Sequence, residues 1–360
     1  MNTFRIQDTL NLQSAATLDG VDMAYESFGH LNQDKSNAIL ICHALTGDAH
    51  VTSNDESKQK GWWEDFVGPG KAIDTQKYFV VCINILGSCL GSTGPASKNP
   101  ATNERYNLNF PIVTIADMVA CQKKVLEALG VSRLHAIVGP SMGGMQALQW
   151  CIDFPDVVKR CIIIASSASL SPQGLAFGTV ARHAIASDEL FKEGQYADKA
   201  PVNGLSIARM IGHITYLSKK SLNKKFGRKL QEKSDYGFDM DVDFQVESYL
   251  SYQGDKFVDR FDANSYLYLS KALSYFDLEK EYGSYEKAFE SIKAKLLVMS
   301  ISSDWLYSTE QIKEWVHVLM HMNKAVSFCE VESDYGHDAF LVESDKFKEF
   351  VCPFLEANHA

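Results

Sequence analysis

The sequence lacks several features that would place the protein in other functional classes. Its eight cysteines form no C-x-x-C pair, which argues against zinc ligation and a disulfide framework. No apolar stretch approaches the roughly 18 to 20 residues that a membrane span needs. Positive charge is scarce, since 35 lysines and arginines face 45 acidic residues, and a net charge of -10 argues against nucleic-acid binding. The first residues show no basic start followed by an apolar block, so we expect no secretory signal and a cytoplasmic protein.

Cysteine placement gives a second indication of a reducing compartment. Four cysteines lie inside predicted strands, namely Cys42, Cys82, Cys161 and Cys329. Cysteines in apolar runs are usually small buried hydrophobic residues that stay reduced. His317 and His321 stand four residues apart, as zinc ligands can, but no third ligand or H-E-x-x-H pattern accompanies them, so we expect no metal site.

One cluster of positive charge departs from the overall balance. Six basic residues lie between Lys219 and Lys233, namely Lys219, Lys220, Lys224, Lys225, Arg228 and Lys229. The cluster fits a solvated helical face, and it also fits the attraction of a phosphorylated acyl carrier such as coenzyme A.

The order of secondary structure predicts an α/β fold with a mostly parallel, doubly wound sheet. Strand-like runs alternate with helical patterns at 21–28, 37–42, 78–84, 134–139, 161–165, 295–301 and 325–331. From about 171 to 290 only helical patterns occur, such as 177–188 and 244–275. We therefore expect a core of residues 1–170 and 291–360 and a helical lid of residues 171–290. The turn-rich segment 87–105 is expected to run over the surface near the site.

The most informative motif is G-P-S-M-G at 139–143, with Ser141 at its centre. An apolar strand precedes it and an amphipathic helix follows it, which is the context of the nucleophile elbow in the α/β-hydrolase fold. Small neighbours allow the chain to turn sharply and expose the serine hydroxyl. The motif predicts a nucleophilic serine, although a glycine-rich structural turn remains the alternative.

A serine nucleophile needs a base, and the base needs a carboxylate that orients it. In this fold the chain order is serine, acid, histidine. Asp304 follows the strand at 295–301, and His337 follows the strand at 325–331 in a glycine-containing loop. Asp334 is the alternative acid, and Asp304 is also placed to cap the next helix.

Acyl transfer also needs backbone N–H groups that stabilise the oxyanion of the tetrahedral intermediate. One is expected from Met142, directly after the serine. The second is expected from the loop after the strand at 37–42, with Leu45 as the candidate, although that loop also fits a plain turn. His43 in the same loop more plausibly shapes it than ligates a metal.

Several segments together resemble the homoserine O-acyltransferases of methionine biosynthesis, which belong to the α/β-hydrolase superfamily. They are I-C-H-A-L-T-G-D (41–48), G-W-W (61–63), G-S-T-G-P-A-S (91–97), G-P-S-M-G-G-M-Q-A-L-Q-W (139–150), F-Q-V-E-S-Y-L-S-Y-Q-G (244–254), R-F-D-A-N-S-Y-L (260–267) and D-Y-G-H-D-A-F-L (334–341). The resemblance spans nearly the whole chain. It implies a ping-pong reaction in which Ser141 accepts an acyl group from acyl-CoA and passes it to the hydroxyl of L-homoserine.

The resemblance also assigns residues to the substrates. It places the acceptor's carboxylate on Arg209, in L-S-I-A-R-M-I-G, and its ammonium on Asp338, although a lid ion pair and a turn carboxylate are the alternatives. Family members that use succinyl-CoA tend to carry an arginine two residues beyond the catalytic acid, where this chain has Leu306. An apolar residue favours acetyl-CoA, because a succinyl carboxylate would lack a partner there.

The resemblance further implies a homodimer built through the lid helices and no cofactor beyond the acyl-CoA co-substrate. Three alternatives stay open at this point. They are a succinyl donor, serine as the acceptor, and a serine hydrolase in which water takes the acyl group.

Overall fold

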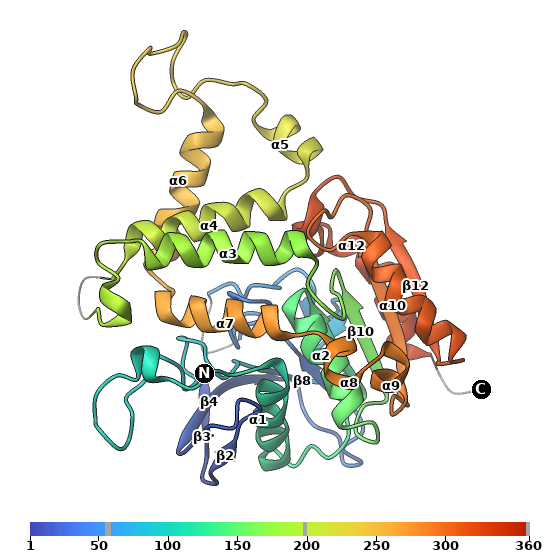
Figure 1. The fold of residues 1–360 in the computed structure, drawn as a ribbon. Coiled ribbons are helices and arrows are strands. Elements are labelled where there is room, and N and C mark those ends of the chain that lie inside the picture. The colour runs from blue at the N-terminus through green and yellow to red at the C-terminus, as the bar shows by residue number, and fades with distance from the viewer. Residues whose placement is uncertain (55–58, 197–199, 358–360) are drawn as a thin grey trace.

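The computed structural model describes residues 1–54, 59–196 and 200–357, and an eight-stranded sheet forms its centre (Figure 1). The strand order is β1-β4-β8-β5-β9-β10-β11-β12. These strands span Asn2–Ile6, Val21–Phe28, Phe79–Ile83, Ala38–Ile41, Ala136–Pro140, Arg160–Ile164, Lys295–Ile301 and Val326–Val331, in that order. Neighbouring strands from β8 to β12 run parallel to one another, whereas β4 runs antiparallel to both of its neighbours, β1 and β8. The predicted mostly parallel α/β sheet is confirmed.

The central strands are buried on both faces of the sheet, because alternate residues enter different hydrophobic clusters. In β5, Leu40 faces one cluster, whereas Ile39 and Ile41 face the other. Helices α1 (Ile115–Ala128), α2 (Met142–Asp153) and α10 (Thr309–His321) contribute to the first cluster. Helix α12 (Ser344–Glu356) and the aromatic pair Trp63 and Phe66 contribute to the second. This two-sided packing fixes where the carboxyl ends of the strands lie.

The regular elements between β10 and β11, within the described part of the chain, are helices. They are α3 (Pro172–Ala186), α4 (Val202–Tyr216), α5 (Lys219–Lys225), α6 (Gln245–Val258), α7 (Ala263–Tyr275), α8 (Leu278–Tyr282) and α9 (Tyr285–Phe289), with the short 3₁₀ turn Lys192–Gly194. Figure 1 shows α3, α4 and α7 layered beside the sheet, with α6 projecting away from the core. The pattern at 244–275, expected as one long helix, is two helices, because Asp262 caps a new start by accepting a hydrogen bond from the Ser265 amide.

The structure differs from the sequence expectations in two ways at the antiparallel side of the sheet. Strand β1 was not predicted, since its five residues are only partly buried and carry little hydrophobic pattern. The segment 87–105 was expected on the surface, yet its first half is largely buried. Ser92 and Thr93 accept hydrogen bonds from the amides of Ala24 and Asp22 in β4, so their hydroxyls replace strand partners at this edge.

The smaller elements complete the path of the chain. Two short sheets pair β2 (Leu10–Asn11) with β3 (Thr17–Leu18) and β6 (Val67–Gly68) with β7 (Ile73–Asp74). Short helical turns span Asn107–Asn109 and Gly336–Asp338, and α11 spans Ala339–Val342. Among the helices described, none is long and apolar enough to cross a lipid bilayer.

Candidate active site

Ser141 lies at the sharp turn between β9 and α2. Its backbone has φ 56° and ψ −125°, a conformation that a non-glycine residue rarely adopts and that stores strain. A Cβ at Gly143 would lie 1.9 Å from the Cys42 carbonyl oxygen, and a Cβ at Gly139 would lie 1.9 Å from the Gly143 carbonyl oxygen. Only glycine fits at these two positions. The geometry is that of the strained strand-to-helix turn predicted from the motif.

The structure brings Asp304 and His337 into contact. The His337 Nδ1 and the Asp304 Oδ2 are 2.7 Å apart, and both side chains are almost fully buried. The other Asp304 oxygen accepts hydrogen bonds from the amides of Leu306 and Tyr307. The alternative acid, Asp334, is exposed and pairs instead with Lys220. Asp304 is therefore the carboxylate that orients His337.

The electrostatics of His337 suit a general base. Burial alone lowers the pKa of the imidazole, but the charge and hydrogen bond of Asp304, together with the charge of Asp338, raise it above its usual value. Because Nδ1 faces the carboxylate, the neutral ring carries its proton there and leaves Nε2 free to accept one.

Tyr307 joins this group although the sequence did not single it out. Its ring lies 5.3 Å from the His337 ring, and its hydroxyl is close enough to Ser141 for the serine side chain to lower the pKa of that hydroxyl. Burial raises the pKa of the Tyr307 hydroxyl, with Asp304 adding to the shift, so the hydroxyl stays protonated. Tyr307 thus connects the serine with the histidine. In the sequence, only its position three residues after the predicted acid Asp304 could have indicated that Tyr307 belongs to the site.

The loop at 43–47 lies next to the elbow, as the oxyanion prediction requires. His43 shapes this loop, since its Nδ1 lies 2.8 Å from the Ala44 carbonyl oxygen and its Nε2 accepts a hydrogen bond from the Ile85 amide. Burial lowers the pKa of His43, which keeps the ring neutral. Leu45 is partly buried, and Met142 is the first residue of α2.

A buried amide links the two segments that carry the predicted oxyanion donors. The Gln146 Nε2 donates to the carbonyl of His43 at 3.1 Å and to the carbonyl of Met142 at 3.4 Å. The Gln122 side chain donates to Gln146, and the Trp150 indole donates to Gln122. Sequence reasoning missed Gln146, although an amide among the apolar residues of α2 is a usable signal because a buried amide needs partners.

Arg209 reaches the same loop from α4. Its Nη1 donates to the Thr46 Oγ1 at 3.3 Å, and its guanidinium lies 4.9 Å from the centre of the Phe257 ring. Among the described residues, no carboxylate lies within 4.0 Å of Arg209. Arg260 donates to the Thr46 carbonyl. The guanidinium of Arg209 is therefore positioned by a hydroxyl and an aromatic ring, with its charge available to an anion.

Asp338 follows His337 directly and is close enough to Arg209 to be affected by its charge. The pKa of its carboxyl is raised to about 6, because desolvation outweighs the attraction of His337 and Arg209. The carboxylate form therefore exists above that pH and is lost below it. Both predicted substrate-binding residues lie beside the triad, with opposite charges.

Leu306 lies next to the site on the acid loop. Its side chain is partly buried and packs against the main hydrophobic cluster, and it lines a cavity together with Trp305 and Ser167. The position thus offers an apolar surface close to Asp304.

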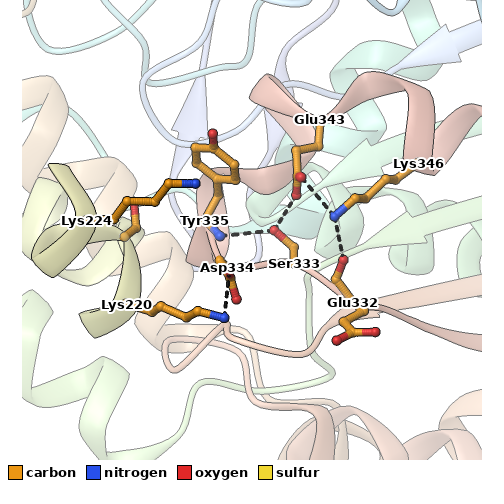
Figure 2. Close-up of a pocket in the computed structure, with 9 residues that line it drawn as sticks. Lys220, Lys224, Glu332, Ser333, Asp334, Tyr335, Glu343 and Lys346 are labelled. Atoms are coloured by element: carbon orange, nitrogen blue, oxygen red, sulfur yellow. Dashed lines mark hydrogen bonds and ion pairs between the residues drawn. The ribbon is translucent and has the colours of Figure 1, made fainter.

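The loop that carries His337 is held by side chains on both sides (Figure 2). Lys220 of α5 pairs with Asp334 at 2.8 Å, and the Ser333 hydroxyl accepts a hydrogen bond from the Tyr335 amide. Ser333 also donates to Glu343, which pairs with Lys346. These contacts fix the path of the chain just before the histidine.

The remaining histidines do not assemble a metal site within the described residues. His317 and His321 are exposed on α10, and no group of three or more histidine, cysteine or carboxylate side chains there is arranged to hold a metal ion.

The link through Gln146 predicts a specific kinetic defect. We expect Gln146→Met to slow acylation of Ser141 by p-nitrophenyl acetate by about 10- to 100-fold, because the two oxyanion segments lose their common donor. Gln149→Met is the matched control, since Gln149 is equally buried on the same helix but bonds to Asp153 and Tyr282. Stopped-flow release of nitrophenol measures the acylation rate, and urea unfolding measures the stability of each variant. Equal slowing in both variants would show that Gln146 has only a general structural role.

Known proteins resemble this chain in sequence and in structure. A family model described as the alpha/beta hydrolase fold matches residues 37–344. A protein of Methanobrevibacter ruminantium named homoserine O-acetyltransferase is 54% identical over 359 residues, which cover 99% of this chain and 73% of that protein. A crystal structure of homoserine O-acetyltransferase from Bacillus anthracis superposes with a TM-score of 0.93 at 28% identity, over 100% of this chain and 98% of the other. The structure of esterase E22 superposes with a TM-score of 0.90 at 29% identity, over 99% of each chain. The chain therefore belongs to the homoserine O-acetyltransferase family of the α/β-hydrolase fold.

Proposed function

We propose that the protein is a homoserine O-acetyltransferase of methionine biosynthesis, which transfers the acetyl group of acetyl-CoA to the hydroxyl of L-homoserine. The observation that carries the proposal is the buried Asp304–His337 pair beside the strained Ser141, with the oppositely charged Arg209 and Asp338 at the same site. The name of the relatives supports the same substrates. The scheme uses acetyl-CoA as a co-substrate and needs no further cofactor.

In the first half-reaction, the Ser141 Oγ attacks the thioester carbonyl carbon and His337 Nε2 takes the hydroxyl proton. Asp304 stabilises the imidazolium that forms. The amides of Leu45 and Met142 donate to the developing oxyanion, each stabilising the transition state by roughly 3 kcal/mol. When the tetrahedral intermediate collapses, the C–S bond breaks, and the leaving thiolate takes the proton from His337. The products are acetyl-Ser141 and free CoA.

In the second half-reaction, His337 takes the proton of the homoserine γ-hydroxyl as that oxygen attacks the acetyl carbonyl. Arg209 binds the carboxylate of the amino acid with its planar fork, and Asp338 receives the ammonium. The ester oxygen of Ser141 leaves with the proton from His337. The Arg209 guanidinium and the Asp338 carboxylate, held at fixed positions, select an amino acid over water or a simple alcohol, because only an amino acid carries both matching charges.

Donor choice depends on Leu306. Its apolar side chain suits the methyl group of an acetyl donor, whereas the second carboxylate of a succinyl donor would be desolvated without a partner, at a cost of about 1 to 3 kcal/mol. Succinyl-CoA is the alternative donor and serine the alternative acceptor.

A hydrolase is the second candidate, because an esterase superposes on this chain almost as well as an acetyltransferase does. Both reactions use the same triad, and they differ only in whether water or the amino acid attacks the acyl-enzyme. The helices from α3 to α9 act as a lid in the transferase proposal and exclude water from that step.

A free-thiol assay tests the proposed function. Acetyl-CoA and succinyl-CoA are each combined with homoserine, serine or neither, and thiol release is followed. We expect acetyl-CoA with homoserine to give the highest kcat/KM, and Leu306→Arg to raise the relative kcat/KM of succinyl-CoA by about tenfold or more, by supplying a partner for its carboxylate. A higher kcat/KM for succinyl-CoA in the unmodified protein would contradict the donor, and fast thiol release that homoserine does not change would favour the hydrolase.

The raised pKa of Asp338 predicts different pH profiles for the two half-reactions. In a ping-pong scheme, kcat/KM for each substrate reports its own half-reaction, and both require neutral His337. Only the homoserine step also requires ionised Asp338, so below about pH 6 we expect the logarithm of kcat/KM to fall with a slope of about two for homoserine and about one for acetyl-CoA. Asp338→Asn should lower kcat/KM for homoserine and reduce its slope to about one. Equal slopes for both substrates in the unmodified protein would refute the assigned role of Asp338.

We further propose that the protein is a homodimer. The arm formed by residues 226–244 projects from the core together with α6 (Figure 1), and Phe238 and Met240 on it are 90% and 101% exposed. Large apolar side chains so fully exposed are unusual on a monomer and fit coverage by a second copy. Sedimentation should give a dimer for the unmodified protein and a monomer for the Phe238→Asp/Met240→Asp variant. A monomeric unmodified protein, or a variant that stays dimeric, would contradict this interface.

We also place the protein in the cytoplasm. Its eight cysteines are free thiols, five of them buried, which fits a reducing compartment. Fractionation of cells that express the protein tests this location, and recovery from a secreted fraction would contradict it.

A further inference from the structure

A groove of about 550 Å³ lies between the acid loop and the turn that joins α4 to α5. Its apolar lining includes Ile214, Leu217, Leu222 and Trp305. Ile214 is 39% exposed and Trp305 is 37% exposed, so their apolar surface is open to a ligand. Lys219 and Lys220 line the same groove. An apolar surface with two cations beside it suits a ligand that has an extended stem and a polyanionic end.

The groove adjoins the catalytic residues through Trp305, which follows Asp304 in the chain. The Trp305 ring is held on two sides, since its indole N–H donates to the Leu217 carbonyl at 3.0 Å and the Phe177 ring packs against it edge-on at 5.4 Å. A ring fixed in this way offers contact area to a ligand without losing side-chain freedom on binding. A ligand in the groove therefore lies one residue away from the triad acid.

Charge distinguishes this groove from the other cavity that Trp305 lines. That second cavity, beside α10, carries Glu310 and Glu314 and has no lysine or arginine in its lining. In the groove, Lys219 has no carboxylate within 4.0 Å among the described residues, whereas Lys220 pairs with Asp334. A polyanion at Trp305 is repelled on the α10 side and attracted on the α5 side.

The cavity drawn in Figure 2 lies next to the groove, since both are lined by Lys220 and Asp334. Its lysines are matched by an equal number of carboxylates, because Glu332, Asp334 and Glu343 face Lys220, Lys224 and Lys346. Two of these lysines are already in ion pairs. The groove has two lysines, Lys219 and Lys220, and one carboxylate, Asp334, so it carries the net positive charge that this cavity lacks and is the more favourable place for phosphates.

We propose that the groove binds the pantetheine arm and the phosphates of the acyl-CoA donor, with the arm along Trp305 and the phosphates at Lys219 and Lys220. This inference rests on the proposed function, which supplies the donor. It assigns a role to the basic cluster that begins at Lys219, and it puts the donor in the groove, whereas Arg209 and Asp338 hold the acceptor. The donor arm and the acceptor then have separate binding regions.

Two donors that differ only in the phosphorylated nucleotide end test the proposal. Steady-state rates are measured with acetyl-CoA and with S-acetylpantetheine, which carries the same thioester and arm but no phosphate. We expect Lys219→Glu to raise KM for acetyl-CoA roughly five- to tenfold, the loss of one or two exposed charge contacts. Its KM for homoserine and its rate with S-acetylpantetheine should stay within about twofold of the unmodified protein, because neither involves a phosphate.

Lys229→Glu is the matched control, since it changes the net charge equally within the same basic cluster but does not line the groove. An equal change of KM for acetyl-CoA in both variants, or no change in either, would overturn the groove assignment. Slower reaction of Lys219→Glu with S-acetylpantetheine would also overturn it, because that result points to a disturbed catalytic loop. If the unmodified protein shows no turnover with acetyl-CoA, the proposed function fails and this inference fails with it. If the unmodified protein turns over acetyl-CoA normally and Lys219→Glu leaves its KM unchanged, the groove assignment fails and the proposed function stands.

Discussion

The steric constraint at the elbow governs the arrangement of the whole site. Strand β9 must turn into α2 within van der Waals contact of the backbone that follows β5, and a Cβ at Gly143 would clash with the Cys42 carbonyl oxygen. Because this position is glycine, the loop at 43–47 lies directly against the first turn of α2. Gln146 then holds together the two segments that carry the predicted oxyanion donors, Leu45 and Met142, through the carbonyls of His43 and Met142. The strain at Ser141 persists because the surrounding packing fixes it.

The second constraint is the attachment of the helical segment to both loops of the triad. Leu217 accepts the hydrogen bond of Trp305 on the acid loop, and Ser218 donates to the Asp334 carbonyl on the histidine loop. Gly336, at φ +76°, packs so closely that a Cβ there would lie 2.6 Å from the Ser218 nitrogen. The turn between α4 and α5 therefore contacts the loop that carries the acid and the loop that carries the base, and it also lines the groove. A movement of this turn is expected to displace both loops together.

Sequence reasoning found the parts of the site that follow from chain order. Ser141, Asp304 and His337 each lie in the connection that follows a parallel strand. Parallel strands bring their carboxyl ends to one edge of the sheet, so the distance between these residues along the chain did not matter. The bounds of β4 and β11 were predicted to the residue. The structure brings Asp304 and His337 together, whereas the roles of Leu45, Met142, Arg209, Asp338 and Leu306 in catalysis remain predictions. What the sequence did not reveal depends on tertiary contact. The roles of Gln146 and Tyr307 follow from the residues that they contact. The hydroxyls of Ser92 and Thr93 accept hydrogen bonds from backbone amides of β4, and no local sequence pattern predicts these bonds.

The central claim is that Ser141 carries the acetyl group between two substrates, and the mass of the acyl-enzyme tests it most directly. The protein is mixed with acetyl-CoA without an acceptor, quenched in acid, and mapped by peptide mass spectrometry, before and after a brief addition of homoserine. The account predicts one acetyl group on the peptide that contains Ser141, its absence in Ser141→Ala, and rapid loss on addition of homoserine with formation of O-acetylhomoserine. Product formation by a Ser141→Ala protein at the unmodified rate, or an acetyl group that water removes as fast as homoserine does, would contradict it.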